Sequence, residues 1–160
     1  MQTRIFLGID PGASGGLAFI ETYGDEISDI RCTPMPSTEA DIWAWFRDET
    51  KACPAVFAMI EQVGGYIGGV GNTGSSMFKF GHSYGLLRMA MIGNMIPFAQ
   101  VTPQVWQKHY GLATRKNEKK NQYKNRLKAM AQQLFPNLSG ITLKTADALL
   151  LAEYCRFKKS

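Results

Sequence analysis

Short apolar runs alternate with polar turns that contain glycine or proline along the first part of the chain. Three such runs stand out, at residues 4–9, 15–20 and 55–60, and residues 26–33 form a weaker candidate strand. Apolar runs of this length, bounded by turn residues, are typical of buried β-strands. The first run stops at Asp10 and the last at Glu61, so the pattern predicts two buried strands that each end in a carboxylate.

Apolar residues at helical spacing mark the longer segments of the chain. In residues 41–50, for example, Ile42, Trp45 and Phe46 fall on one face of a helix. Further helices are expected over 77–95 and over 146–157, and a short helix is expected after Thr102-Pro103. Another helix follows from the basic segment and ends at about Leu134, and a short strand is expected at 97–101. This order predicts an α/β fold, a mixed sheet flanked by helices, in a single domain over residues 1–160.

Two apolar features in the second half predict buried positions. The segment 83–96 is apolar on more than one face, which indicates a buried helix, either in the core or in a dimer interface. Phe78 and Trp106 are expected to pack in the core.

The positive charge of the chain is concentrated in one segment. The 160 residues include 18 Lys and Arg and 13 Asp and Glu, a net charge of +5. Seven of the basic residues and only one acidic residue lie between Arg115 and Lys128. Such a patch attracts a polyanion, because bound phosphates release their counterions. A solvated helix face is the alternative interpretation of the same run.

Composition also bears on compartment. The three cysteines lie far apart and form no CxxC pair, which favours a reducing compartment such as the cytoplasm. The N-terminal run is interrupted at Asp10, so we expect no signal peptide, and no apolar run approaches the roughly 20 residues of a membrane helix.

Three carboxylates are the candidates for chemistry. Asp10 and Glu61 end apolar strands, and Asp147 falls in the first turn of an apolar helix. Strand ends and helix N-termini are where α/β folds build sites, and Mg²⁺ prefers carboxylate oxygens together with phosphate and water. Each acid alone is weak evidence, because a strand end is usually at the surface and Asp147 suits a helix dipole.

The sequence settings of these acids resemble the RuvC-like Holliday-junction resolvases. The matching pieces include Gly8-Ile9-Asp10-Pro11-Gly12, Glu61-Gln62, Ser76-Met77-Phe78-Lys79-Phe80-Gly81, Val101-Thr102-Pro103-Gln104-Val105-Trp106, Leu134-Phe135-Pro136 and Ala146-Asp147-Ala148-Leu149-Leu150. The resemblance covers about residues 4–157 and is greatest to the branch found in bacteriophages and chloroplasts.

That resemblance implies an RNase H-like (RuvC-type) fold, a homodimer, and cutting of two opposed strands at a four-way DNA junction with Mg²⁺ or Mn²⁺. It gives Asp10, Glu61 and Asp147 the roles of catalytic and metal-binding residues. In that chemistry one metal activates a water for attack on phosphorus and a second stabilises the leaving oxygen.

Lys144 is a departure from the family pattern. The family usually has an acid or a histidine about three residues before the last Asp, and a lysine cannot bind Mg²⁺. The site then works with three acids, holds the second metal weakly, or belongs to an inactive form.

The resemblance also assigns DNA contacts. The glycine-rich segment 64–74 is expected to reach the crossover, with Tyr66 stacking on an unpaired base, unless it is only a surface loop. Backbone N–H groups at Ser75 and Ser76, at the start of the next helix, are expected to bind phosphate. The candidate phosphate-binding side chains are Lys108, Arg115, Lys116, Lys119, Lys120 and Lys124, and the essential one among Lys119, Lys120 and Lys124 is left open.

Other functions remain open at this stage. The chain could instead cut flaps or other branched DNA, or bind junctions without cutting them. Sugar kinases and actin share a similar phosphate turn, but they clamp ATP between two such domains and this chain has room for one. The expected location is the cytoplasm, with an organelle, a nucleoid or a phage origin as alternatives.

Overall fold

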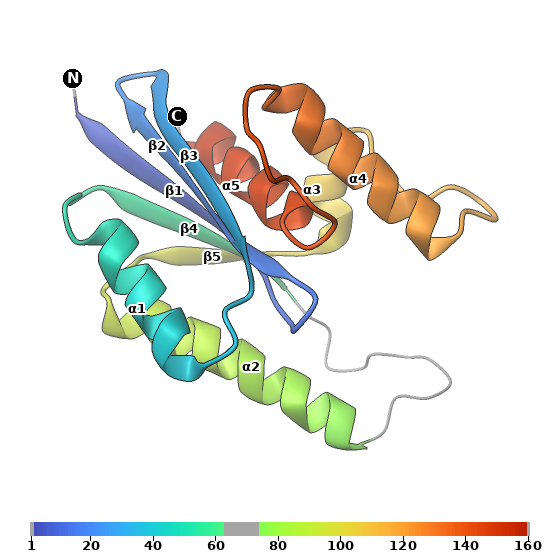
Figure 1. Ribbon diagram of the computed structural model, residues 1–160, viewed down its shortest axis with the longest axis horizontal. Helices are drawn as coiled ribbons and strands as arrows, with labels where there is room; N and C mark the ends of the chain where they lie inside the picture. Colours follow the sequence, from blue (N-terminus) through green and yellow to red (C-terminus); the bar gives the residue numbers. More distant parts are fainter. Residues whose placement is uncertain (1, 63–73, 160) are drawn as a thin grey trace.

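The computed structural model describes residues 2–62 and 74–159, whose centre is one five-stranded sheet (Figure 1). The strands lie in the order β3-β2-β1-β4-β5. β1 pairs antiparallel with β2 and parallel with β4, β2 pairs antiparallel with β3, and β4 pairs parallel with β5. The strands are β1 Thr3–Asp10, β2 Gly16–Tyr23, β3 Glu26–Pro34, β4 Val56–Glu61 and β5 Phe98–Val101.

Helices cover both faces of the sheet (Figure 1). They are α1 Glu39–Thr50, α2 Gly74–Gly93, α3 Pro103–His109, α4 Lys120–Leu134 and α5 Ala146–Lys159. α1 and α2 lie on one face, and α3, α4 and α5 lie on the other. The predicted mixed α/β sheet flanked by helices is therefore confirmed. Among the described helices, none is long and apolar enough to cross a membrane.

The alternation of side chains along β1 and β4 turns both strand-terminal acids toward α5. Successive residues of a strand face opposite sides of the sheet. In β1, Ile9 packs in the core under α1 and α2, whereas Phe6 packs in the core under α5. Asp10 shares the phase of Phe6, and Glu61 shares the phase of Met59, which also packs on the α5 side. Both acids therefore belong to the face covered by α3, α4 and α5.

A close approach between β1 and α5 depends on Gly8. A Cβ atom at this position would lie 1.9 Å from the carbonyl oxygen of Ala148 and 2.3 Å from the backbone nitrogen of Ala152. No real side chain is tolerated at such distances, so only glycine lets the helix backbone rest on the strand. This contact fixes the first turn of α5, and with it Asp147, beside the end of β1.

α2 is buried on one side only, so the core accounts for part of the predicted apolar surface and the dimer interface stays a prediction for the rest. Only Leu87, Ala90 and Met91 are buried in it, and its first half extends beyond the sheet (Figure 1). Phe78, predicted to lie in the core, is 74% exposed, and Met89 and Ile92 are exposed as well. The prediction that Phe78 lies in the core was wrong, because α1 and the sheet cover only one side of the helix and Phe78 lies on another.

Candidate active site

Three carboxylates from distant parts of the chain meet at one end of the sheet. Asp10 ends β1, Glu61 ends β4, and the parallel register that joins Ile9 to Ile60 puts these strand ends side by side. Asp147 joins them from the first turn of α5. Asp10 and Asp147 are buried, and Glu61 is half-buried. The structure thus brings together the three acids that the sequence pattern selected.

Burial and mutual repulsion make these carboxylates difficult to ionise. Burial raises the pKa of Asp10 well above its ordinary value, and the negative charges of Asp147 and Glu61 raise it further. Burial also raises the pKa of Glu61 and of Asp147. A cluster of acids with raised pKa values is an electrostatic setting that a cation would stabilise.

Lys124 supplies one cation to this cluster. Its ammonium forms an ion pair with Oδ2 of Asp147. Burial lowers the pKa of Lys124, but the charges of Asp147, Asp10 and Glu61 outweigh that effect, so its pKa is raised. Lys124 lies on α4 three residues before the fully buried Leu127, which faces α5 in the same core. Of the three lysines left open by the sequence, Lys124 is therefore the one at the acids, whereas Lys119 and Lys120 are exposed.

Trp106 holds Glu61 from the other side. Its indole Nε1 donates a hydrogen bond of 2.8 Å to Oε2 of Glu61, and its side chain is fully buried. The prediction that Trp106 is a core residue is confirmed, but its contact with the candidate site was missed. The available clue was chemical, since a buried indole N–H requires an acceptor.

The donor set is suited to a hard divalent cation. Oδ1 of Asp147 is buried without a hydrogen-bond partner among the described residues, although its other oxygen binds Lys124. Within residues 2–62 and 74–159, no three His, Cys, Asp or Glu side chains are arranged to hold a metal ion. Mg²⁺ commonly needs only one or two carboxylates, with water and phosphate oxygens completing its shell. The residues therefore fit a metal that the substrate helps to bind.

The backbone of Lys144 lies close to the strand that pairs with Asp10. A Cβ atom at Gly16 would lie 2.7 Å from the carbonyl oxygen of Lys144, and Gly16 pairs with Asp10 across β1 and β2. The Lys144 side chain is exposed and forms no ion pair with any residue in the described ranges. The expected consequence of Lys144, a site with three acids, a weakly held second metal or an inactive form, stays a prediction.

Most of the basic segment is exposed, but one of its cations is structural. Arg126 pairs with Glu118 at 3.2 Å and donates to the carbonyl of Ala113 at 3.0 Å. Glu118 in turn accepts a hydrogen bond from the backbone N–H of Arg115. These contacts hold the loop before α4, so the remaining cations project from an ordered surface. The exposed cations of this region are Lys108, Arg115, Lys116, Lys119 and Lys120.

The other candidate DNA contacts are placed unevenly. Ser75 and Ser76 are exposed, and both lie at the start of the described part of α2. Tyr66 lies outside the residues that the structure describes. The DNA contacts expected at these three positions stay predictions.

Comparison with known proteins identifies the fold. No protein-family model matches the chain, and no curated protein matches it. Among solved structures, RuvC of Thermus thermophilus in complex with Holliday junction substrate is similar, with a TM-score of 0.66 and 15% identity over 97% of this chain and 94% of that chain. A second Thermus thermophilus RuvC structure has a TM-score of 0.58 and 15% identity over 96% of each chain. The chain therefore has the RuvC-type, RNase H-like fold that its motifs predicted.

Likeness at this level of identity concerns the fold. The comparisons do not separate the phage and chloroplast branch from other RuvC-like proteins, so the branch stays a prediction.

Proposed function

We propose that this chain is a divalent-metal-dependent endonuclease that resolves four-way DNA junctions by paired phosphodiester hydrolysis. The observation that carries the proposal is the buried group of Asp10, Glu61 and Asp147, paired with Lys124, at the end of a RuvC-type sheet. The solved neighbour of the same fold is described in complex with a Holliday junction, which supports branched DNA as the substrate.

The carboxylates are the residues that would hold Mg²⁺ or Mn²⁺. The metal supplies activation of the attacking water and neutralisation of charge on the phosphate. Asp147 offers its unpartnered Oδ1, and Asp10 lies within electrostatic range of it. Glu61 is kept in one orientation by Trp106, which leaves its second oxygen available.

Lys124 is suited to the scissile phosphate. In the protein alone its ammonium neutralises Asp147, and a phosphate entering the site offers it a second anionic partner. The ammonium then stabilises negative charge that develops on phosphate oxygens during hydrolysis. The exposed cations from Lys108 to Lys120 bind the duplex arms at a distance from the acids.

Two opposed cuts require two sites, and α2 offers a surface for a second copy of the chain. One exposed side of this helix carries apolar and glycine residues at helical spacing, namely Phe78, Gly81, Gly85, Met89 and Ile92. A Cβ atom at Gly81 or Gly85 would meet no atom within 4 Å among the described residues, so another helix can approach closely there. Homodimerisation through α2 is therefore part of the proposal.

Cleavage of three synthetic substrates tests the function. A four-way junction, a flap and a linear duplex are incubated with the protein in Mg²⁺, in Mn²⁺ and in chelator. We expect symmetric cuts in the junction only, with metal, and loss of cutting in Asp10→Asn. Asp48→Asn is the matched control, because Asp48 is an exposed acid of α1 that pairs with Arg47.

The other outcomes identify the alternatives. Equal cutting of the flap would replace the proposal with a general branched-DNA nuclease. Tight junction binding without cutting in either metal would indicate a junction-binding protein.

A further inference from the structure

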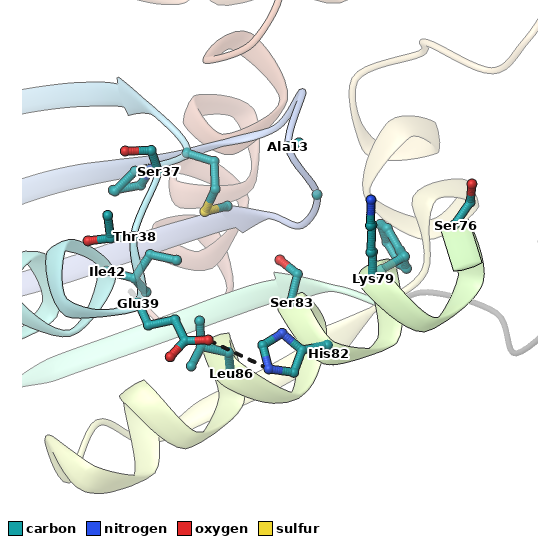
Figure 2. Close-up of a pocket in the computed structure, with 14 residues that line it drawn as sticks. Ala13, Ser37, Thr38, Glu39, Ile42, Ser76, Lys79, His82, Ser83 and Leu86 are labelled. Carbon is teal, nitrogen blue, oxygen red and sulfur yellow. Dashed lines mark ion pairs between the residues drawn. The ribbon is translucent and has the colours of Figure 1, made fainter. Parts of the chain in front are cut away.

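A cavity of about 670 Å³ lies on the face of the sheet opposite the acids, between the β1–β2 turn, the start of α1 and the first half of α2 (Figure 2). Its volume falls within the roughly 300–1,000 Å³ typical of small-molecule sites. Gly12 and Ala13 of the turn line it, and they follow closely after Asp10 in the sequence. The cavity and the acids thus lie on the two sides of one short turn.

The inner wall of the cavity is apolar. Met35, Ile42, Phe80 and Leu86 line it, and all four are at least half-buried. The Phe80 ring is packed so tightly on the turn that a Cβ atom at Gly12 would lie 3.1 Å from it. The turn itself is tied to the end of β3, because Met35 N–H donates to the carbonyl of Gly15 at 3.0 Å. The wall is therefore preorganised for a flat apolar group.

The polar groups of the cavity are divided between its two ends. Glu39 and His82 face each other at one end, with 3.6 Å between His82 Nε2 and Glu39 Oε1, a contact that is an ion pair when the imidazole is protonated (Figure 2). The Lys79 side chain points toward the Ala13 turn at the other end. Within the described chain Lys79 forms no ion pair, so the end nearest Asp10 presents an uncompensated positive charge.

We propose that this cavity binds one nucleotide of the substrate strand, with its base on the apolar wall and its phosphate on Lys79. The inference rests on the proposed function and extends it, because it places one nucleotide of the bound strand in a site separate from the acids. An apolar wall of base size, with a cation at one end, matches the chemistry of an unstacked nucleotide. At the crossover of a junction the stacking between arms is interrupted, so a nucleotide there costs less to unstack than one inside a continuous duplex.

Two variants change the cavity without touching the acids. Ser83→Phe adds a ring from the middle of the α2 wall and fills the space, and Lys79→Gln removes the positive charge. Arg88→Gln is the matched control for charge, because Arg88 is an exposed cation of the same helix that does not line the cavity. Circular dichroism and gel filtration establish that each variant folds.

Junction affinity, measured in chelator so that no cutting occurs, is the readout. Each protein is titrated with an intact four-way junction and with junctions in which one nucleotide near the crossover is abasic. We expect Ser83→Phe and Lys79→Gln to weaken binding of the intact junction at least about fivefold, the lower range for one stacked base. One abasic position should weaken wild-type binding similarly and have no added effect in Ser83→Phe, because both changes remove the same interaction.

The remaining outcomes are decisive in different ways. Binding unchanged in Ser83→Phe and Lys79→Gln, or additive abasic effects, would overturn the nucleotide subsite while leaving junction binding intact. If wild-type protein shows no preference for the junction over linear duplex, the proposed function fails instead. A parallel titration with a free deoxynucleoside monophosphate separates the sources: binding that depends on Lys79 there, without any effect on the junction, would also overturn the strand subsite.

Discussion

The indole of Trp106 donates a hydrogen bond of 2.8 Å to Glu61, although the two residues lie 45 positions apart in the chain. Trp106 is fully buried on α3, and Glu61 is the last residue of β4. The bond fixes one oxygen of the carboxylate and partly offsets the rise that burial causes in the Glu61 pKa. Trp106 therefore acts on the candidate site through the orientation of Glu61.

Replacing Trp106 by Phe should weaken metal binding while largely keeping the core. The ring volume is mostly retained, but Glu61 loses its donor and its fixed orientation. Loss of such a supporting hydrogen bond typically costs about 10–100-fold in metal affinity. Calorimetric titration with Mn²⁺ measures it, with Trp43→Phe on α1 as the control, because Trp43 is 42% exposed and distant from the acids. Equal Mn²⁺ affinity in Trp106→Phe and wild type would show that the hydrogen bond is only structural.

Asp10→Asn should stabilise the metal-free protein at neutral pH while abolishing cleavage. Because burial and its acidic neighbours raise the folded-state pKa of Asp10, the folded protein binds a proton more tightly than the unfolded chain does. Its contribution is therefore favourable below the ordinary pKa near 3.8 and is lost as pH rises through the raised value. An asparagine does not titrate, so we expect Asp10→Asn to be more stable than the wild type at alkaline pH and about equally stable at low pH.

Urea unfolding in chelator at acidic and alkaline pH measures this difference, with Asp48→Asn as the exposed control. Lower stability of Asp10→Asn than of wild type at pH 8 would contradict the electrostatic account of the site.

Lys124→Met should remove cleavage and destabilise the fold at neutral pH. Without the ammonium, the buried Asp147 carboxylate loses its ion pair, a loss of about 1.5–3 kcal/mol for a hydrogen bond to a charged group. Lys128→Met, a cation of the same helix outside the candidate phosphate-binding set, is the matched control and should retain both properties. Thermal unfolding and single-turnover cleavage measure the two effects, and full activity in Lys124→Met would exclude the lysine from the reaction.

Gly8→Ala should be among the most damaging small substitutions in the chain. The added methyl would overlap the α5 backbone at Ala148 and Ala152, so β1 and α5 must separate. We expect a loss of about 3 kcal/mol and weaker metal binding, because Asp147 moves away from Asp10. Gly74→Ala, where a Cβ atom would meet no described atom within 4 Å, should change stability by only about 1 kcal/mol. Comparable unfolding midpoints for the two variants would contradict the close approach at Gly8.

Replacing Lys116, Lys119 and Lys120 together by Gln should weaken binding to all DNA substrates alike. These side chains are exposed, and none of them pairs with an acid of the site in the described residues, so they contribute to backbone binding rather than to cutting. The slope of log affinity against log salt should fall by about 0.9 for each phosphate that the variant no longer neutralises. Fluorescence anisotropy at several salt concentrations measures the slope, and an unchanged slope would mean that the run is only a solvated face.

The sequence by itself predicted two buried strands that end in carboxylates, and the resemblance of the surrounding motifs to the RuvC-like resolvases selected the three acids. Apolar runs that stop at Asp10 and Glu61 define strands, and the two-residue period of a strand decides which face each acid shares. Asp147 could be included because its place in the first turn of an apolar helix is also a local property. These features depend on neighbours within a few positions, and such neighbours are visible in any linear pattern.

Only the tertiary structure decided which long-range partners these residues have. Lys124, Lys120 and Lys119 are equivalent as sequence, and the packing of α4 on α5 through Leu127 selects Lys124 for Asp147. The exposure of Phe78 was likewise undetermined, because a helix that is apolar on several faces does not specify which face the sheet will cover. Pairing and burial between distant segments depend on how helices dock, and no period along the chain encodes that arrangement.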